Sequence, residues 1–270
     1  MIKSNQLTRI FSIFILTLLL ISCGSNETGL EETPPRTADD VREDFSNLVI
    51  NAGTNDLTIE SLVNNVFWNF RIIMPEGTSE SNKRPLIFSL HGAALSATPD
   101  SHKSTDCLVT PGFEELDAII ISPNSNKQFW FEPANQSQVL ALVDLASSYL
   151  PVDKEKVVIT GYSDGGNGSW FFAQYYPALF SASIPMASSF DTAHSGSVEK
   201  IDVPLYVIHG SEDQLFPIET TEGYVDQSIL AGSSIEFVTA DGLDHLDVCD
   251  YVPYLKDAAQ WLVTSVWTNN

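Results

Sequence analysis

Residues 157–166 read VVITGYSDGG, a run of mostly β-branched residues that leads directly into a serine between glycines. The run predicts a buried strand, and the aromatic-rich stretch 167–176 after it is expected to be helical. A strand, a sharp turn and a helix form the context that a nucleophile elbow requires, because the turn exposes the serine hydroxyl. Glycines are needed on both sides, since side chains there would collide with neighbouring backbone. The pattern predicts that Ser163 is a nucleophile.

Further apolar runs alternate with helical stretches on both sides of this motif. The expected strands cover residues 66–74, 85–90, 118–122, 156–160, 205–208 and 235–238, and the expected helices cover 138–150, 167–176, 219–230 and 251–267. Strands that alternate with helices of ten or more residues predict a largely parallel sheet. We therefore expect an α/β fold: one doubly wound domain with helices on both faces and ligands at the carboxyl ends of the strands.

A serine hydroxyl is a poor nucleophile unless a base takes its proton. Three histidines follow Ser163 in the chain, namely His194, His209 and His245. His245 lies in a loop between the last expected strand and the C-terminal helix, where the base of such a site should be. His194 falls in a Ser/Asp/Gly-rich loop and is interpreted as a bystander, whereas His209 lies at a strand end and is interpreted as structural.

The base in turn needs a carboxylate that orients it. The expected strand 205–208 is followed by His-Gly-Ser-Glu-Asp, which places Asp213 on the turn leaving this strand. The chain order serine, acid, histidine is the one found when the nucleophile lies on such an elbow. Asp213 is the predicted acid, and its neighbour Glu212 is the alternative.

An oxyanion hole requires backbone N–H groups aimed at the charge that develops on a carbonyl oxygen. One should be the amide of Asp164, directly after the nucleophile. The other should come from residues 89–94, SLHGAA, where a strand ends in small residues. We predict the Ala93 amide, with His91 organising the loop.

These pieces together resemble the α/β-hydrolase superfamily: His91-Gly92, residues 161–166, residues 209–213 and His245. More narrowly they are similar to the phospholipase/carboxylesterase, polyhydroxybutyrate-depolymerase and feruloyl-esterase-like group, over about residues 65–267. The resemblance implies a serine carboxylic-ester hydrolase that works through an acyl-enzyme. The sequence contains no metal-ligand spacing and no phosphate-binding glycine loop, so we expect no metal and no cofactor. Residues 93–96 read AALS where many esterases are glycine-rich, and no insertion is long enough for a substantial lid.

The residues expected to contact the substrate lie on the loops after the strands 85–90 and 118–122. In the group that the chain resembles, a tryptophan near the position of Trp130 lies beside the catalytic serine, so Trp130 and His91 are the candidate substrate-binding residues. Aromatic side chains at a strand end could stack on a planar acyl group or a sugar. Alternatively, Phe129 and Phe131 pack into the core and Trp130 alone is exposed.

The N-terminus has the features of an export signal. Residues 1–22 combine a basic start with the apolar run 10–21, which is short for a membrane span. Leu-Ile-Ser-Cys at 20–23 resembles the lipobox of bacterial lipoproteins, which implies lipidation of Cys23 and attachment to a membrane, in the outer membrane and facing the periplasm or the cell surface. An ordinary secretory signal is the alternative. Residues 23–48 are polar and acidic and are expected to form a flexible tether, with the catalytic domain at 49–270.

The net charge of the chain limits which molecules it can bind, and its cysteine content limits which disulfides it can form. The net charge of −22 disfavours nucleic acid and anionic polymers as partners. With Cys23 as the anchor, Cys107 and Cys249 remain, and they can pair with each other in an oxidising compartment. Two independent buried cysteines are the alternative.

The expected substrate is therefore a small-molecule or polysaccharide-linked ester outside the cytoplasm. Four alternative functions are consistent with the sequence: a phospholipase, a polyester depolymerase, a peptidase of the prolyl-oligopeptidase type, and a non-catalytic surface binding module on a hydrolase scaffold.

Overall fold

The computed structural model describes residues 34–193 and 196–268. The strands are β1 (Gly53–Glu60), β2 (Phe67–Met74), β3 (Arg84–Leu90), β4 (Ile119–Pro123), β5 (Val152–Tyr162), β6 (Ala182–Met186), β7 (Leu205–Gly210) and β8 (Ile235–Ala240). The α-helices are α1 (Ala38–Ser46), α2 (Val109–Gly112), α3 (Pro133–Tyr149), α4 (Asp164–Tyr175), α5 (Ile218–Leu230) and α6 (Val252–Trp261). Short turns include η2 (Ser101–Lys103), η5 (Val248–Tyr251) and a π-helical turn at Leu262–Val266 that extends α6.

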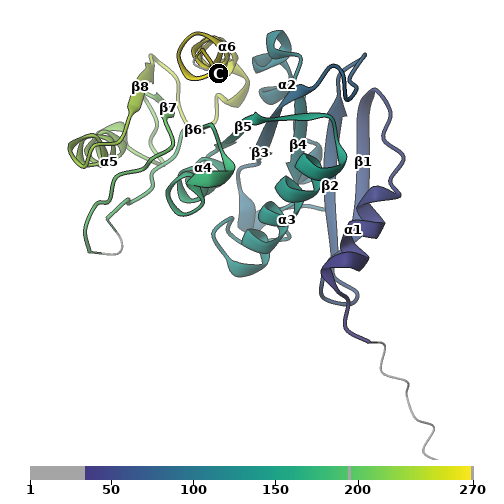
Figure 1. The fold of residues 1–270 in the computed structure, drawn as a ribbon. Helices are drawn as coiled ribbons and strands as arrows, with labels where there is room; N and C mark the ends of the chain where they lie inside the picture. The colour runs from purple at the N-terminus through teal and green to yellow at the C-terminus, as the bar shows by residue number, and fades with distance from the viewer. Residues whose placement is uncertain (1–33, 194–195, 269–270) are drawn as a thin grey trace, which may run out of the picture. The chain divides into compact units, whose positions relative to one another are not determined.

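In this part of the chain the eight strands form one sheet, in the order β1-β2-β4-β3-β5-β6-β7-β8 (Figure 1). β1 and β2 pair antiparallel, as do β2 and β4, and every pairing from β4 to β8 is parallel. Parallel neighbours need crossover connections, which the helices supply. The predicted α/β fold with a doubly wound, mostly parallel sheet is confirmed.

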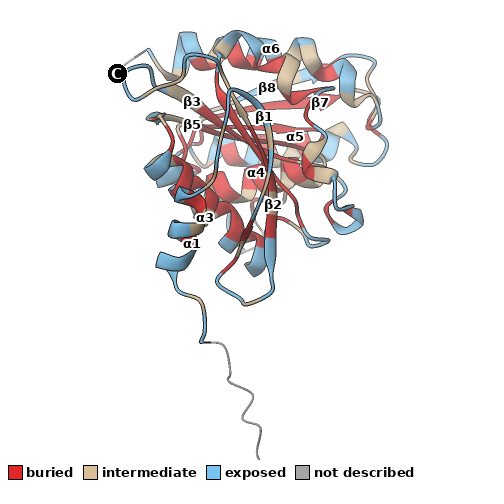
Figure 2. Ribbon diagram, turned by 90° about the vertical axis from the view of Figure 1, so that its right-hand side faces the viewer, coloured by how far each residue is buried: buried red, intermediate tan, exposed pale blue. Residues whose placement is uncertain are grey.

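The sheet is buried on both faces, which explains its continuous apolar runs. Along β3, Leu86 and Phe88 pack into a cluster with α1, α3, α4 and α5, whereas Ile87 packs on the other face with α2 and α6. Figure 2 shows the buried residues concentrated in the sheet and on the helix sides that face it. The carboxyl ends of β3, β5 and β7 consequently lie at one edge of a rigid core, where side chains can be held in fixed positions.

One predicted boundary is wrong. Within the segment 23–48 assigned to a flexible tether, residues 38–46 form α1, which begins with a capping box between Thr37 and Asp40. Val41 and Phe45, one turn apart, are buried against the core. This single apolar stripe anchors a helix that is otherwise polar, so the folded domain begins near residue 35 and not at 49.

The other N-terminal predictions lie outside the described residues. These are the export signal at 1–22, the lipidated Cys23 and the first part of the tether. Among the residues that the structure does describe, no helix is long and apolar enough to cross a membrane.

Candidate active site

Ser163 lies on the turn between β5 and α4, at the carboxyl end of a central strand. Its backbone has φ 56° and ψ −120°, a conformation that costs a non-glycine residue about 1–3 kcal/mol. The turn is tight because Gly165 lies directly against the Leu90 carbonyl of β3, and any side chain at Gly165 would overlap it. The strained turn projects the Ser163 hydroxyl out of the sheet.

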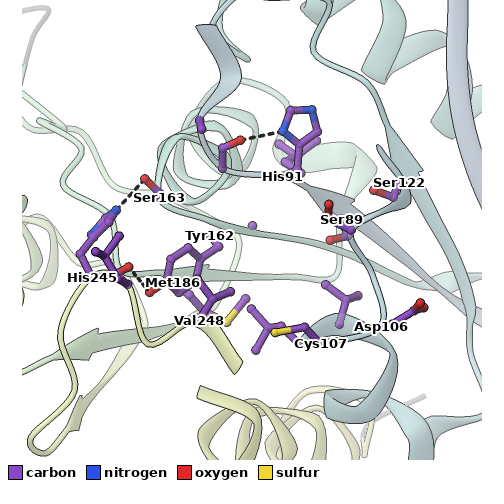
Figure 3. Close-up of a pocket in the computed structure, with 18 of the residues that line it drawn as sticks. Ser89, His91, Asp106, Cys107, Ser122, Tyr162, Ser163, Met186, His245 and Val248 are labelled. Atoms are coloured by element: carbon purple, nitrogen blue, oxygen red, sulfur yellow. Dashed lines mark hydrogen bonds between the residues drawn. The ribbon is translucent and has the colours of Figure 1, made fainter. Parts of the chain in front are cut away.

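The structure brings Ser163, His245 and Asp213 together in one chain of hydrogen bonds. The Ser163 hydroxyl lies 2.8 Å from His245 Nε2, and His245 Nδ1 lies 2.7 Å from Asp213 Oδ2 (Figure 3). A carboxylate can only accept, so the imidazole proton is on Nδ1 and Nε2 accepts from Ser163. His245 is 8% exposed and Asp213 5% exposed. This is the arrangement in which an imidazole can take a proton from the serine.

The Asp213 carboxylate is held in one orientation by its own turn. Its Oδ1 accepts hydrogen bonds from the amides of Leu215 and Phe216, at 2.9 and 2.8 Å. The Phe216 ring packs edge-on against the His245 imidazole, with centroids 5.2 Å apart. Glu212, the alternative acid, is exposed to solvent, and its backbone amide donates to the Leu243 carbonyl at 3.0 Å.

His209 lies in the core beside this network. The ring is fully buried, and its Nε2–H donates to the Phe216 carbonyl at 2.7 Å. Burial lowers the pKa of His209, which keeps the ring neutral. His209 therefore supports the turn that carries Asp213, and His194, the other alternative base, lies outside the described residues.

The loop after β3 faces Ser163. Ala93 adopts the left-handed conformation, with φ 50° and ψ 45°, and lines the same cavity as the serine. Asp164 is the first residue of α4, so its amide has no acceptor within the helix. The Asp164 carboxylate accepts a hydrogen bond from the Ala94 amide at 2.8 Å. The loop that carries the Ala93 amide is thus tied to the residue after the serine, as a two-amide oxyanion hole would require.

His91 lines the cavity, but both of its ring nitrogens are already used. Nδ1 donates to the Gly92 carbonyl at 2.7 Å, and Nε2 accepts from the Ser125 amide at 3.1 Å. Burial lowers the pKa of His91, which favours the neutral ring that this pattern needs. The residue organises the loop and presents only its carbon edge to a ligand.

The prediction that Trp130 binds substrate is wrong. Its side chain is completely buried and packs against Gly168 of α4 and edge-on against His91. Its Nε1–H donates to the His91 carbonyl at 2.9 Å. Phe131 is the most exposed aromatic residue of this segment, and its ring stacks on the half-buried Phe129. Trp130 lies near the site, as expected, but it supports the loop from behind.

Tyr162 was not predicted to take part. Its hydroxyl donates to the His245 carbonyl at 2.8 Å, and its ring packs edge-on against Tyr251 of η5. Burial raises the pKa of Tyr162, so the hydroxyl remains a donor. Tyr162 fixes the backbone of His245. The sequence gives no signal for this contact, because 83 residues separate Tyr162 from His245.

A cavity of about 750 Å³ opens in front of Ser163. Much of its wall is apolar, and the contributing side chains include Leu108, Val109, Met186, Leu215 and Val248. Such a volume is suited to a small organic ligand. Within residues 34–193 and 196–268, no group of three His, Cys, Asp or Glu side chains is placed to hold a metal ion.

Cys107 and Cys249 form a disulfide, with Cα atoms 5.1 Å apart. Cys107 lines the cavity, and Cys249 belongs to η5, shortly after the His245 loop. The bridge therefore joins two walls of the cavity that come from distant parts of the chain.

Replacing both cysteines by serine is expected to lower the free energy of unfolding by about 5 kcal/mol, because the bridge closes a long loop. The residues it joins are 142 positions apart. Urea denaturation followed by tryptophan fluorescence measures the change. A reductant should lower the wild-type midpoint and leave the variant unchanged. Coinciding midpoints for the two proteins would contradict this prediction.

Replacing Asp164 by alanine is expected to reduce kcat for an ester about 10- to 100-fold, less than the loss of a whole oxyanion donor. The reason is that the Ala94 amide loses its carboxylate partner and the Ala93 loop is released. Asp164→Asn is the matched control, since its amide oxygen can still accept. Equal losses of kcat in both variants would argue against a positioning role for the carboxylate.

Ser163, Asp213 and His245 all lie in the part of the chain that matches a family model. The model of the Dienelactone hydrolase family matches residues 123–261, just over half of the 270 residues. No curated protein matches the chain by sequence.

Solved structures share the fold at low sequence identity. A thermostable esterase is 20% identical with a TM-score of 0.66; the match covers 78% of this chain and 62% of that one, which is less than two thirds of its length. Thermogutta terrifontis esterase 2, phosphorylated by paraoxon, is 17% identical with a TM-score of 0.62, covering 78% and 94%. S-formylglutathione hydrolase from Staphylococcus aureus is 19% identical with a TM-score of 0.60, covering 80% and 99%. These likenesses establish the α/β-hydrolase fold.

Proposed function

Because the chain belongs to the dienelactone hydrolase family, we propose that it is a serine carboxylic-ester hydrolase that acts through Ser163, His245 and Asp213. The observation that carries this proposal is the unbroken hydrogen-bonded chain from the Ser163 hydroxyl through the His245 imidazole to the Asp213 carboxylate. It stands at the mouth of a cavity and on a strained turn.

In the proposed reaction, the Ser163 oxygen attacks the ester carbonyl carbon while His245 Nε2 takes the hydroxyl proton. The carbonyl oxygen gains negative charge and is stabilised by the amides of Ala93 and Asp164. His245 then returns the proton to the alcohol oxygen, and the C–O bond breaks to leave an acyl-enzyme. Water, deprotonated by His245, releases the acid and restores Ser163. Asp213 stabilises the His245 imidazolium both when the acyl-enzyme forms and when water hydrolyses it.

The substrate we propose is a small or polysaccharide-linked ester outside the cytoplasm. The apolar wall of the cavity supports an acyl group of moderate size. The lipobox-like sequence at 20–23 supports export and lipid attachment through Cys23. Incorporation of labelled palmitate into the wild-type protein, and none into a Cys23→Ser variant, would be expected if the protein is a lipoprotein.

The purified protein should hydrolyse short-chain 4-nitrophenyl esters and leave aminoacyl 4-nitroanilides intact. Turnover of the anilides alone would favour a peptidase. Absence of turnover on acetyl, longer acyl, aromatic acyl and polyester substrates would favour a binding module.

A further inference from the structure

The floor of the cavity carries two serine hydroxyls, from Ser89 of β3 and Ser122 of β4. The strands pair in parallel with Phe88 opposite Ile121, so the next residues of each strand, Ser89 and Ser122, lie side by side. Both are 3% exposed, and both line the cavity (Figure 3). The sheet therefore presents a pair of adjacent serine side chains to the cavity.

Neither hydroxyl makes a hydrogen bond to another residue of the described chain, and neither is among the fully enclosed polar atoms that lack a partner, so both hydroxyls reach the cavity. The neighbouring strands differ: Thr160 of β5 donates to the Ile184 carbonyl at 2.7 Å, and Ser183 of β6 donates to the Ser169 carbonyl at 3.1 Å. A hydroxyl that reaches the cavity without a partner in the protein can exchange water for a polar group of a ligand. A pair of such groups at the floor of a cavity is suited to a polar group of the ligand.

The position of this pair indicates which part of an ester it meets. Figure 3 shows His245 on one side of Ser163, and Ser89 with Ser122 on the other. In the proposed reaction the leaving alcohol must stay near His245, since His245 protonates it. The part of the cavity that leads away from His245 therefore receives the acyl group.

The charges around the floor favour a neutral polar group over an anion. Arg71 is the cross-strand neighbour of Ser122, but its guanidinium is already bound to Asp56 and to the Lys103 carbonyl, each at 2.8 Å. The Lys103 ammonium, at the same end of the cavity, pairs with Asp100 at 2.8 Å. A carboxylate at the end of the acyl group would find both of these cations already paired.

We propose that Ser89 and Ser122 form a subsite for a hydroxyl group at the far end of the acyl group of the substrate. Two side-by-side serine hydroxyls can donate to and accept from such a group at once. The subsite rests on the proposed esterase function and adds to it a substrate class: esters whose acyl group has an apolar body and a hydroxylated end.

The test compares 4-nitrophenyl esters that differ only at the end of the acyl chain. Heptanoate and 6-hydroxyhexanoate have the same number of heavy atoms, and shorter and longer pairs cover the unknown depth of the subsite. The measured quantity is the ratio of kcat/KM for the hydroxylated ester to that for its apolar partner. In Ser89→Ala/Ser122→Ala, the ratio at the best-fitting length should fall about tenfold for each hydrogen bond lost. Each single variant should show part of this fall.

Two controls separate the subsite from a structural effect. The Tm of the double variant should not fall, because no hydrogen bond within the described chain is lost. Ser183→Ala removes a buried hydroxyl that points to α4, so the ratio should stay at the wild-type value. If the kcat/KM ratio of the double variant stayed within about twofold of the wild-type ratio at every chain length, the subsite would be overturned. Loss of even one weak hydrogen bond should change the ratio by more than about twofold. Failure of the wild-type protein to hydrolyse any ester would overturn the proposed function, and the subsite with it.

Discussion

Replacing Ser163 by alanine is expected to reduce kcat for a short-chain ester about 10⁶-fold, since removal of the nucleophile of such a site costs about this much. His245 would remain in place, held by Tyr162 and Asp213, but no oxygen would stand 2.8 Å from its Nε2. The residual rate would be that of water in the same cavity. Stopped-flow or long-time assays of 4-nitrophenolate release measure the change.

Ser169→Ala is the matched control for this variant. Ser169 lies on α4, the helix that follows the Ser163 turn; it is fully buried, and its hydroxyl donates to the Gly166 carbonyl within the helix. Its loss should leave kcat essentially unchanged. If Ser163→Ala kept the wild-type kcat with an unchanged Tm, Ser163 would not be the nucleophile.

Replacing Asp213 by asparagine is expected to reduce kcat about 10⁴-fold through a change of tautomer. The Leu215 and Phe216 amides both donate to Oδ1, so the oxygen of an asparagine would stay with them. The NH₂ group would then face His245 Nδ1, and Nδ1 would have to accept. The imidazole proton would move to Nε2, which could no longer take the proton of Ser163.

Glu212→Gln removes the adjacent carboxylate and should leave kcat near the wild-type value. Steady-state kinetics of the two variants on one ester compares them directly. If kcat fell strongly in Glu212→Gln and only slightly in Asp213→Asn, Glu212 and not Asp213 would be the acid that orients His245.

The features that sequence predicted well are those set by local chemistry. The position of Ser163 follows from glycines that the turn itself requires and from the β-branched run that precedes it. Asp213 and His245 could be chosen because each follows an expected strand, and carboxyl ends of parallel strands share one edge of the sheet. The sheet was predictable for the same reason, since a strand buried on both faces reads as a continuous apolar run.

Features that depend on distant packing were missed. Trp130 is buried because Gly168, on another element, leaves room for its ring. α1 is polar apart from Val41 and Phe45, and only the packed core reveals what these two side chains cover. β1 is an edge strand with a single buried residue, and β6 contains a proline, which usually argues against a central strand. The pairing of Ser89 with Ser122 depends on the register of two strands that lie about 30 residues apart in the chain.

Labelling with a fluorophosphonate tests the central claim most directly, because such a probe reacts only with a serine hydroxyl that a neighbouring base activates. Peptide mapping of the labelled protein by mass spectrometry locates the modified residue. We expect the label on Ser163 in the wild-type protein, on no serine in Ser163→Ala, and only slowly on Ser163 in Asp213→Asn. Absence of labelling in folded wild-type protein, or label on another serine that persists in Ser163→Ala, would contradict a catalytic Ser163.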